Sequence, residues 1–456
     1  MAFLDENYLL RGDESKKLYA AVKDLPIIDA HNHCDVKALA EDRNFTDLWD
    51  AEAATDHYVW EVLRKSGVPE YLLTGKDASN HDKWIAMAAA FEKVAGNPTY
   101  EWIHLDLKRR LGIDELITAD NAEAIWEKSK AVLAKKEFSQ QNLIKQMNVE
   151  AMCSTDDPAD TLEYHQALQK SQLKGIVHPT FRPDKAMNIF KPDFADYVKT
   201  LGNRWNIAIK TIDDLLAALK AAHDFFAENG CVASDHGVAV PYGLQVAKQD
   251  AEAVFQKALA RKPLTEAETV AYMSYIFNEV AEMDAQKGWV FQIHIGAVRD
   301  VRDSLYNSLG ADVGGDISDH LTDYIANLLP LLNRFDGRLK TVLYNMNPIH
   351  NATLAQLTRA FGNTVSLGLA WWLNDSFIGM KNQLEYSTSV DTFANMGGMV
   401  SDSRKILSYG SRHEMFRRTL CHVLGNEVEL GQMPSEVAER IAVNLSYTRP
   451  KTLFGL

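Results

Sequence analysis

The stretch LPIIDAHNH (residues 25–33) joins a short apolar run to two histidines that are separated by one residue. Seven further β-like runs follow it, and most are apolar throughout, as strands buried on both faces of a parallel sheet are. The eight runs cover residues 25–33, 148–157, 174–184, 230–237, 289–296, 339–347, 363–372 and 397–404.

Helical patterns separate several of these runs. The clearest covers residues 250–287, where Thr265 and Glu268 form a capping-box pattern, and others cover 319–335 and 353–361. Repeated alternation of strand and helix predicts an α/β fold, a (β/α)8 TIM-type barrel. The alternative is an open doubly wound sheet, but that fold usually shows a glycine-rich phosphate loop after an early strand, and the sequence has none.

The interval between the first two runs is far longer than the others. It has helical patterns, including residues 56–67 and 121–138. Because insertions accumulate at the catalytic face of a barrel, we expect a large helical insertion after the first strand. The expected domains are a catalytic barrel formed by 1–34 with 140–456, and a helical insertion or lid over the catalytic face, 35–139.

Composition excludes several classes of protein. The net charge of −14, from 48 basic and 62 acidic residues, argues against a nucleic-acid partner. No run approaches the roughly 18 apolar residues of a membrane span, and the first residues lack the pattern of a secretion signal. The four cysteines (Cys34, Cys153, Cys231 and Cys421) form no CxxC pair, which suits a reducing compartment. We therefore expect a cytoplasmic protein with no membrane partner.

Polar residues at the ends of the runs give candidate site residues. Residues at i and i+2 of a strand point to the same side, so His31 and His33 could bind one ion. In the last run Asp402 and Arg404 have the same spacing. Asp402 could complete the metal site, act as a base, or do both, and Arg404 could hold it ionised or stabilise an oxyanion.

Other runs end in residues with more than one interpretation. Arg182 could bind a carboxylate or phosphate, or form a surface ion pair. His294 could face the site or be a core histidine bonded to the backbone. Trp371 and Trp372 could stack on a sugar or fill the core.

Together these residues resemble a known family. A histidine pair after strand one with an aspartate after strand eight is similar to the amidohydrolase superfamily of metal-dependent barrels. Several stretches resemble uronate isomerase within it, and the similarity spans nearly the whole chain. They are PIIDAHNH (26–33), DHYVWEVLRKSGV (56–68), HPTFRPD (178–184), HIGAVRD (294–300), AWWLND (370–375) and SDSRKILSYGSRHEMFRR (401–418).

The sequence also departs from the binuclear hydrolases of that superfamily. They usually bring a bridging lysine or glutamate from the fourth strand and a histidine from the sixth. This chain has Ser234-Asp235-His236 and Tyr344-Asn345 there. A second metal, and the metal-bridged hydroxide of hydrolysis, are therefore poorly supported.

The resemblance implies aldose–ketose isomerisation of a hexuronate in a cytoplasmic homo-oligomer. The reaction would convert D-glucuronate to D-fructuronate, and D-galacturonate to D-tagaturonate, by moving a proton between C2 and C1 through a cis-enediol. His31, His33 and Asp402 would hold one divalent ion, with zinc as the first choice and loose binding allowed. Asp402 is the first candidate for the base, and Arg404 and Tyr58 would stabilise the intermediate.

The resemblance also implies substrate contacts. Arg182 would hold the substrate carboxylate, and His57, Asp235, His294 and Trp372 would shape the contacts to the sugar hydroxyls. Tyr58 could instead be a packed aromatic on an amphipathic helix.

Two rival functions stay open at this point. The first is a mononuclear metal-dependent hydrolase of a small amide, ester or lactone, which would use the same His-x-His and aspartate set. The second is a barrel that binds sugar acids without catalysis.

Overall fold

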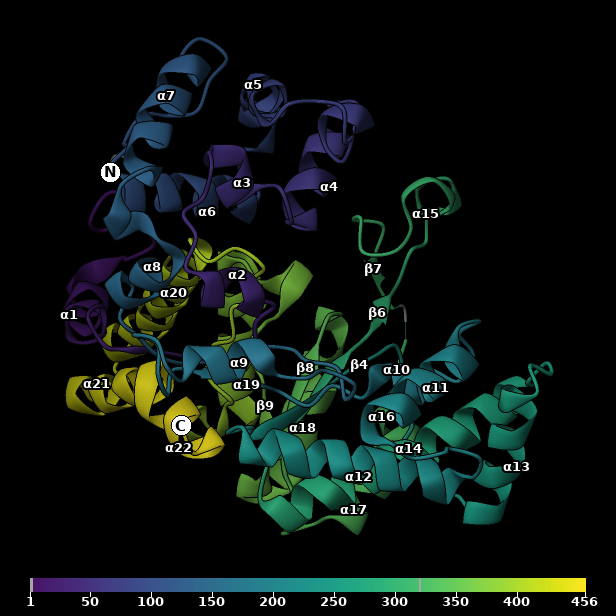
Figure 1. Cartoon of the computed structure of the whole chain (residues 1–456). Coiled ribbons are helices and arrows are strands. Elements are labelled where there is room, and N and C mark those ends of the chain that lie inside the picture. The colour runs from purple at the N-terminus through teal and green to yellow at the C-terminus, as the bar shows by residue number, and fades with distance from the viewer. Residues whose placement is uncertain (1–2, 320) are drawn as a thin grey trace.

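Seven short parallel strands form the centre of the molecule (Figure 1). The computed structural model describes residues 3–319 and 321–456. The seven strands are β1 (Ile27–Asp29), β2 (Val149–Cys153), β3 (Val177–His178), β4 (Ala233–Val238), β5 (Val290–Ile295), β8 (Lys340–Asn345) and β9 (Val365–Leu367). Six of them lie inside predicted runs, and β4 extends one residue beyond the predicted run 230–237.

Neighbouring strands in the sheets are also neighbours in the sequence. One sheet has the order β1-β2-β3 and the other has β4-β5-β8-β9, and all their ladders are parallel. Phe181 lies between the two sheets and forms parallel bridges to Asp156 and to Ser234. This order is expected when a crossover connection after each strand places the next strand parallel to it and directly beside it. The prediction of a mixed α/β fold is confirmed.

The eighth run, 397–404, differs from the prediction because it is not a regular strand. Its backbone still bonds both end strands: Gly397 N–H donates to Leu367 O at 2.8 Å, and Asp402 N–H donates to His31 O at 3.1 Å. His33 N–H donates to Ser403 O at 3.0 Å. Asp402 has a φ of 51°, in the left-handed region, which a β-ladder does not accept.

Helices follow most strands. They are α9 (Glu163–Leu168), α10 (Asp184–Met187), α11 (Phe194–Trp205), α12 (Ile212–Glu228), α13 (Lys248–Leu259), α14 (Glu266–Lys287), α16 (Tyr324–Asn327), α17 (Leu329–Arg334), α18 (Asn351–Ala360), α19 (Phe377–Val390), α20 (Ser408–Glu429), α21 (Ser435–Val443) and α22 (Arg449–Phe454). The capping box of Thr265 and Glu268 is present at the start of α14.

Two predicted helical segments are each divided in the structure. Residues 250–287 form parts of α13 and α14, because Arg261 has a φ of 52° and Pro263 lies in the connection. Residues 319–335 contain only the short helices α16 and α17, and His320 in that segment lies outside the described residues.

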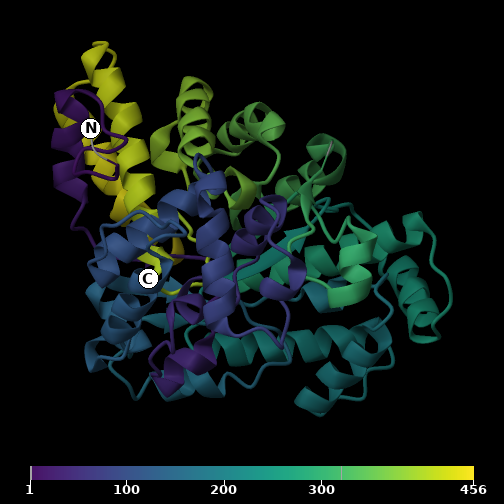
Figure 2. The same cartoon turned by 90° about the horizontal axis from the view of Figure 1, so that it is seen from above.

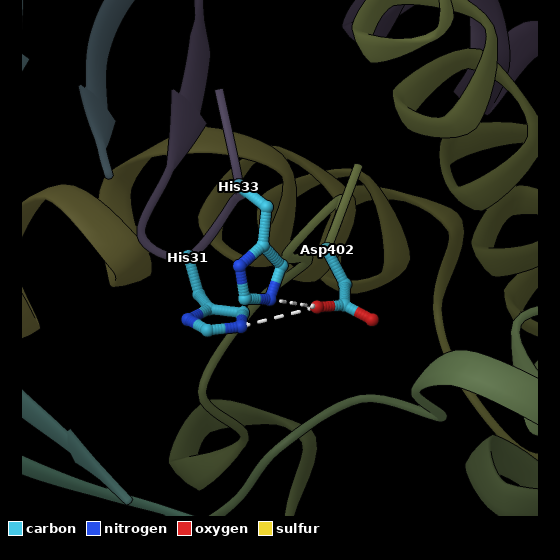
Figure 3. Close-up of side chains that lie close together, drawn as sticks. All are labelled: His31, His33 and Asp402. Atoms are coloured by element: carbon cyan, nitrogen blue, oxygen red, sulfur yellow. Dashed lines mark hydrogen bonds and ion pairs between the residues drawn. The ribbon is translucent and has the colours of Figure 1, made fainter. Parts of the chain in front are cut away.

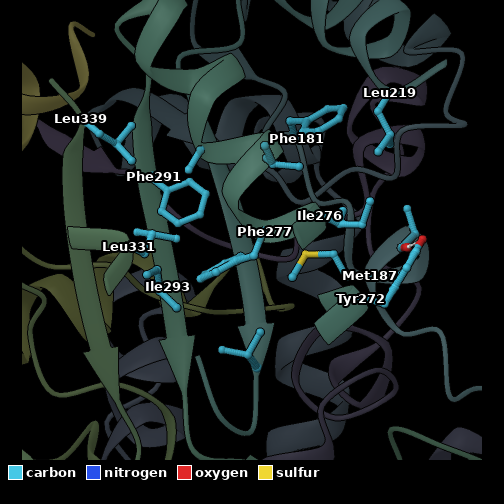
Figure 4. Packing of buried hydrophobic residues seen from close by; sticks show 14 of the residues in the cluster. Phe181, Met187, Leu219, Tyr272, Ile276, Phe277, Phe291, Ile293, Leu331 and Leu339 are labelled. Carbon is cyan, nitrogen blue, oxygen red and sulfur yellow. Dashed lines mark hydrogen bonds between the residues drawn. The ribbon is translucent and has the colours of Figure 1, made fainter. Parts of the chain in front are cut away.

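A core of buried side chains lies between the second sheet and its helices (Figure 4). Phe291 and Ile293 of β5 belong to it together with Ile276 and Phe277 of α14. Burying a side chain of this size contributes about 1.5–3 kcal/mol. The core thus holds rigid the strands whose ends carry the candidate site.

The stretch between β1 and β2 is helical, as predicted. Its helices are α2 (Val36–Glu41), α3 (Leu48–Glu52), α4 (His57–Lys65), α5 (Asn80–Phe91), α6 (Pro98–Asp106), α7 (Ala122–Leu133) and α8 (Gln140–Gln146). Near the N-terminus, α1 (Gly12–Val22) packs against α20, so a segment from the start of the chain lies beside one from its C-terminal part, as Figures 1 and 2 show.

A projecting arm between β5 and α16 was not predicted. It consists of the antiparallel strands β6 (Ala297–Val298) and β7 (Ile317–Ser318) with α15 (Asp303–Leu309) between them (Figure 1). Arg64 of α4 donates hydrogen bonds to Val313 O and Gly314 O, both at 3.1 Å, which ties the arm to the insertion. Strands of two residues are too short to show an alternating pattern in the sequence.

Within residues 3–319 and 321–456, no helix combines the length and the apolar character that crossing a bilayer requires.

Candidate functional site

His31 and His33 follow β1 and converge on one oxygen of Asp402 (Figure 3). The Nε2 atom of each histidine lies 3.1 Å from Asp402 Oδ1. Asp29 fixes the two segments to each other, because its carboxylate accepts hydrogen bonds from Ser401 N–H at 2.8 Å and from Ser401 Oγ at 2.6 Å. Residues 372 positions apart in the sequence are thus held next to each other by backbone and side-chain hydrogen bonds.

The backbone of Asp402 is in a conformation that is unusual for a residue with a side chain. Its φ of 51° lies in the left-handed region, and the cost of such a conformation is of order 1–3 kcal/mol. The hydrogen bond from Asp402 N–H to His31 O helps to hold the backbone in this conformation. Strain of this kind clusters at functional sites, which is consistent with the choice of Asp402 as a candidate site residue.

Asp402 is ionised and His33 is neutral near pH 7. Burial disfavours the Asp402 carboxylate, but its contacts with His31 and His33 outweigh burial and hold its pKa well below the ordinary value. Burial lowers the pKa of His33 to about 4. For His31, burial acts against the charged form, yet Asp235 and Asp402 raise its pKa above the ordinary value.

Tyr58 reaches Asp402 from the helical insertion. Asp56 caps α4 and accepts a hydrogen bond from Tyr58 N–H at 2.9 Å. The Tyr58 hydroxyl donates to Asp402 Oδ2 at 3.1 Å. Burial and the neighbouring charge of Asp402 raise the pKa of Tyr58 well above its ordinary value, so the phenol keeps its proton.

Asp235 forms a second charged centre behind the histidines. Its carboxylate lies 3.0 Å from Arg182 Nη1, 2.6 Å from His294 Nδ1 and 3.6 Å from His31 Nδ1. Burial would raise the pKa of Asp235, but Arg182, His31 and His294 together hold it well below its ordinary value. Arg182 Nε also donates to Asp184 at 2.7 Å, so this guanidinium already has two carboxylate partners.

These residues surround a cavity of about 290 Å³. Eight of the ten predicted site residues line it: His31, His33, His57, Arg182, His294, Trp372, Asp402 and Arg404. The other two, Tyr58 and Asp235, reach the cavity through their bonds to Asp402 and Arg182. All ten predicted residues therefore gather at one place.

The prediction missed several residues of the cavity. Arg299 and Asp312 line it, and the Arg299 guanidinium lies 4.6 Å from the Trp372 ring centroid. Arg299 belongs to the quoted stretch HIGAVRD, which was a usable signal. Asp312 lies on the arm, and nothing in the sequence placed the arm at the site. Arg412 of α20 does not line the cavity, but its guanidinium lies 5.0 Å from the Tyr58 ring centroid, and its ordinary helical pattern gave no signal of this contact.

The donor set fits a metal ion. Donor atoms of His31, His33 and Asp402 lie within 4.8 Å of one another, and those of His31, Asp235 and His294 do too. In a tetrahedral zinc site, ligands about 2.1 Å from the ion are about 3.4 Å apart, close to the observed spacing. His31 Nδ1 and His294 Nε2 are buried without a hydrogen-bond partner among the described residues. This histidine and aspartate cluster could therefore hold a metal.

Comparisons with known proteins agree with this geometry. The profile of a family described as glucuronate isomerase matches residues 1–454. The curated uronate isomerase of Thermotoga neapolitana is 47% identical over 452 residues, which is 99% of each chain. The crystal structure of uronate isomerase from Thermotoga maritima has a TM-score of 0.97 at 46% identity and covers all of both chains.

A more distant structure leads to the same family. The glucuronate isomerase of Caulobacter crescentus has a TM-score of 0.95 at 29% identity, covering 99% of this chain and 97% of that one. The matches extend over the insertion, the strand ends and the C-terminal helices together. They confirm the resemblance that the sequence motifs indicated, and the chain belongs to the glucuronate isomerase family, whose members are also named uronate isomerases.

Proposed function

We propose that the chain interconverts D-glucuronate and D-fructuronate, and also D-galacturonate and D-tagaturonate. One observation of the structure carries the proposal: an ionised carboxylate, Asp402, lies in a cavity between two histidines and a protonated phenol. Family membership supplies the class of reaction. The rest follows from what an aldose–ketose isomerisation needs.

The reaction moves one proton from C2 to C1 of the open-chain sugar. Asp402 removes the C2 proton as general base, because its low pKa keeps it unprotonated and its position faces the cavity. The C1 oxygen gains a proton as the cis-enediol forms. The C2 hydroxyl then loses its proton as the C2 carbonyl forms, and the proton returned to C1 completes the ketose. Tyr58 and Arg404 stabilise the negative charge that develops between these steps.

The anionic end of the substrate needs cationic partners. Arg182, Arg299 and Arg404 all line the cavity. We assign the substrate carboxylate to Arg182, since a guanidinium has five N–H donors and its two acidic partners leave some of them available. His57, Asp235, His294 and Trp372 then position the sugar hydroxyls.

We assign one divalent ion, zinc first, to His31, His33 and Asp402. The neutral state of His33 and the ionised state of Asp402 suit metal binding near pH 7. Bound there, a divalent ion supplies positive charge beside the developing enediolate. A carboxylate that binds an ion tightly is a weak base, so this assignment suits a loosely held ion.

We also propose that the strands close into a (β/α)8 barrel and that residues 35–139 form a lid. The backbone bonds of the 397–404 segment to β9 and to the end of β1 support closure. The proposal of a lid is supported by His57 and Tyr58, which belong to α4 of the insertion and reach the cavity. The barrel domain is then 1–34 with 140–456.

The protein acts, in this proposal, as a cytoplasmic homo-oligomer. The four cysteines are buried and unpaired in the structure, which suits a reducing compartment. Exposed apolar side chains on the arm, such as Tyr306 and Ile317, are suited to contact with another copy of the chain.

The decisive test is a D2O assay that runs D-glucuronate and D-galacturonate in parallel, with added zinc. We expect new ketose signals in the NMR spectrum and exchange of the C2 proton. Absence of both would refute the proposal. Turnover of an amide, ester or lactone without exchange would indicate a hydrolase, and binding of uronate without any exchange would indicate a binding protein.

A further inference from the structure

A second and larger chamber adjoins the catalytic cavity. Its volume is about 760 Å³, against about 290 Å³ for the cavity that contains Asp402. The two share a wall formed by Arg182, Gly237, Ala297, Arg299 and Asp312. Sites for small ligands hold about 300–1,000 Å³, so the inner cavity suits a single sugar and the outer chamber leaves room for more.

The outer chamber has the chemistry of a sugar-acid site. Val270 and Met273 of α14 and the ring of Tyr242 give it apolar surface. Lys191 lines it as well, and its Nζ makes no ion pair among the described residues and lies 5.7 Å from the Phe190 ring centroid. Asp184, Glu266, Asp300 and Asp312 also line the chamber, and their carboxylates can accept hydrogen bonds from sugar hydroxyls. Apolar surface can cover the face of a sugar ring, and Lys191, which makes no ion pair among the described residues, can bind a carboxylate.

The orientation of the substrate decides which end faces this chamber. In the proposed function, C1 and C2 lie at Asp402 and the carboxylate lies at Arg182. Because Arg182 belongs to the shared wall, the C4 to C6 end of the sugar faces the outer chamber. A substituent on O4 would therefore leave the cavity through that wall, while C1 stays free to react.

We propose that the enzyme also isomerises the reducing-end uronate of short (1→4)-linked uronic-acid oligosaccharides. The second sugar lies in the outer chamber against Val270 and Tyr242, with its carboxylate near Lys191. This inference rests on the proposed function. The chemistry is unchanged: the C2–H bond of the reducing-end unit breaks, a C1–H bond forms, and the glycosidic bond stays intact. The product is a ketose that carries the second sugar on O4.

The test uses the full-length enzyme with three substrates in D2O: D-glucuronate, D-galacturonate and (1→4)-linked digalacturonate. We expect exchange at C2 of the reducing end of digalacturonate, with kcat/KM within about tenfold of the value for D-galacturonate. Exchange of the monosaccharides without the disaccharide would overturn this inference and leave the proposed function intact. Failure of all three substrates would overturn the proposed function itself.

Two variants locate the second sugar. Val270→Trp fills the outer chamber and should abolish activity on the disaccharide while leaving the monosaccharides unaffected. Lys191→Glu should raise KM for the disaccharide about tenfold, because an attraction becomes a repulsion. Lys145→Glu on α8 changes the net charge equally and is the matched control, with no expected effect. If Val270→Trp and Lys191→Glu slow both kinds of substrate equally, the chamber is only an entrance and the inference is wrong.

Discussion

Replacing Tyr58 by phenylalanine tests the role of the insertion in catalysis. The change removes a hydroxyl that donates to Asp402 Oδ2 at 3.1 Å. Phenylalanine keeps the ring, which stacks on His57 with centroids 4.8 Å apart and faces Arg412. Packing should therefore change little, and the effect should fall on Asp402.

The size of the effect follows from the hydrogen bond that the Tyr58 hydroxyl would donate to the negative charge developing on the substrate in the proposed mechanism. A bond to a charged acceptor contributes about 1.5–3 kcal/mol, and about 1.4 kcal/mol corresponds to a factor of ten in rate. We therefore expect Tyr58→Phe to lower kcat about 10- to 150-fold with little change in KM. The loss of a donor also destabilises the charged form of Asp402 and raises its pKa. Because the base must be ionised, the acid limb of the kcat profile should move to higher pH.

The assay is the rate of ketose formation from D-glucuronate, measured by NMR over a range of pH. Tyr197→Phe is the matched control, because its hydroxyl also donates to a carboxylate, Asp157, at 3.0 Å, and neither residue lines the cavity. It should leave kcat and the pH profile unchanged. If Tyr58→Phe keeps kcat within twofold of the unmodified enzyme, with the same acid limb, Tyr58 has no part in the reaction.

Three further predictions concern the base, the anchor of the insertion and the metal. Asp402→Asn should lower kcat about 10²- to 10⁴-fold in the NMR assay, and near-normal activity would exclude it as the base. Lys405→Met leaves buried Glu52 without its cation at 3.1 Å and should cost about 3–5 kcal/mol in urea unfolding. Burial already raises the pKa of Glu52 against the opposing effect of Lys405, and a carboxyl with a raised folded-state pKa loses stability as pH rises. The cost should thus be larger at pH 8 than at pH 5, and an equal cost would contradict this account. A chelator should remove metal and activity together, and zinc should restore both. His31 is also a proposed ligand and its pKa is raised above the ordinary value, so the measured metal content should begin to fall as the pH falls through the ordinary histidine range, before His33 is protonated near pH 4.

Much of the site could be predicted because parallel strands bring their ends together. His31, Arg182, Asp235 and His294 lie at the ends of separate runs, and the alternation of strand and helix is enough to place them at one edge. Local pattern carries this information, since burial on both faces makes each strand apolar along its length. The family resemblance added Tyr58, whose helical pattern alone allowed a structural role.

The rest depends on long-range contacts that leave no local pattern. The arm contributes Arg299 and Asp312, but its strands have only two residues each. Arg412 occupies one position of a long buried helix, and its proximity to Tyr58 depends on how α20 packs. The left-handed backbone of Asp402 could not be predicted either, because glycine is the residue that usually indicates such a conformation in a sequence.

The spacing within residues 402–405 explains how the insertion and the proposed base, Asp402, are coupled. Asp402 contacts His31 and His33, and three residues later Lys405 is buried against Glu52 of α3 at 3.1 Å and Asp56 at 3.5 Å. Asp56 caps the helix that carries Tyr58, so the same short segment holds both the carboxylate and the helix whose hydroxyl meets it. Movement of the insertion would stretch the Lys405 contacts and the hydroxyl bond together. A buried charge without partners is costly, so the position of the insertion in which Lys405 keeps its contacts with Glu52 and Asp56 is favoured. In that position the Tyr58 phenol lies beside Asp402.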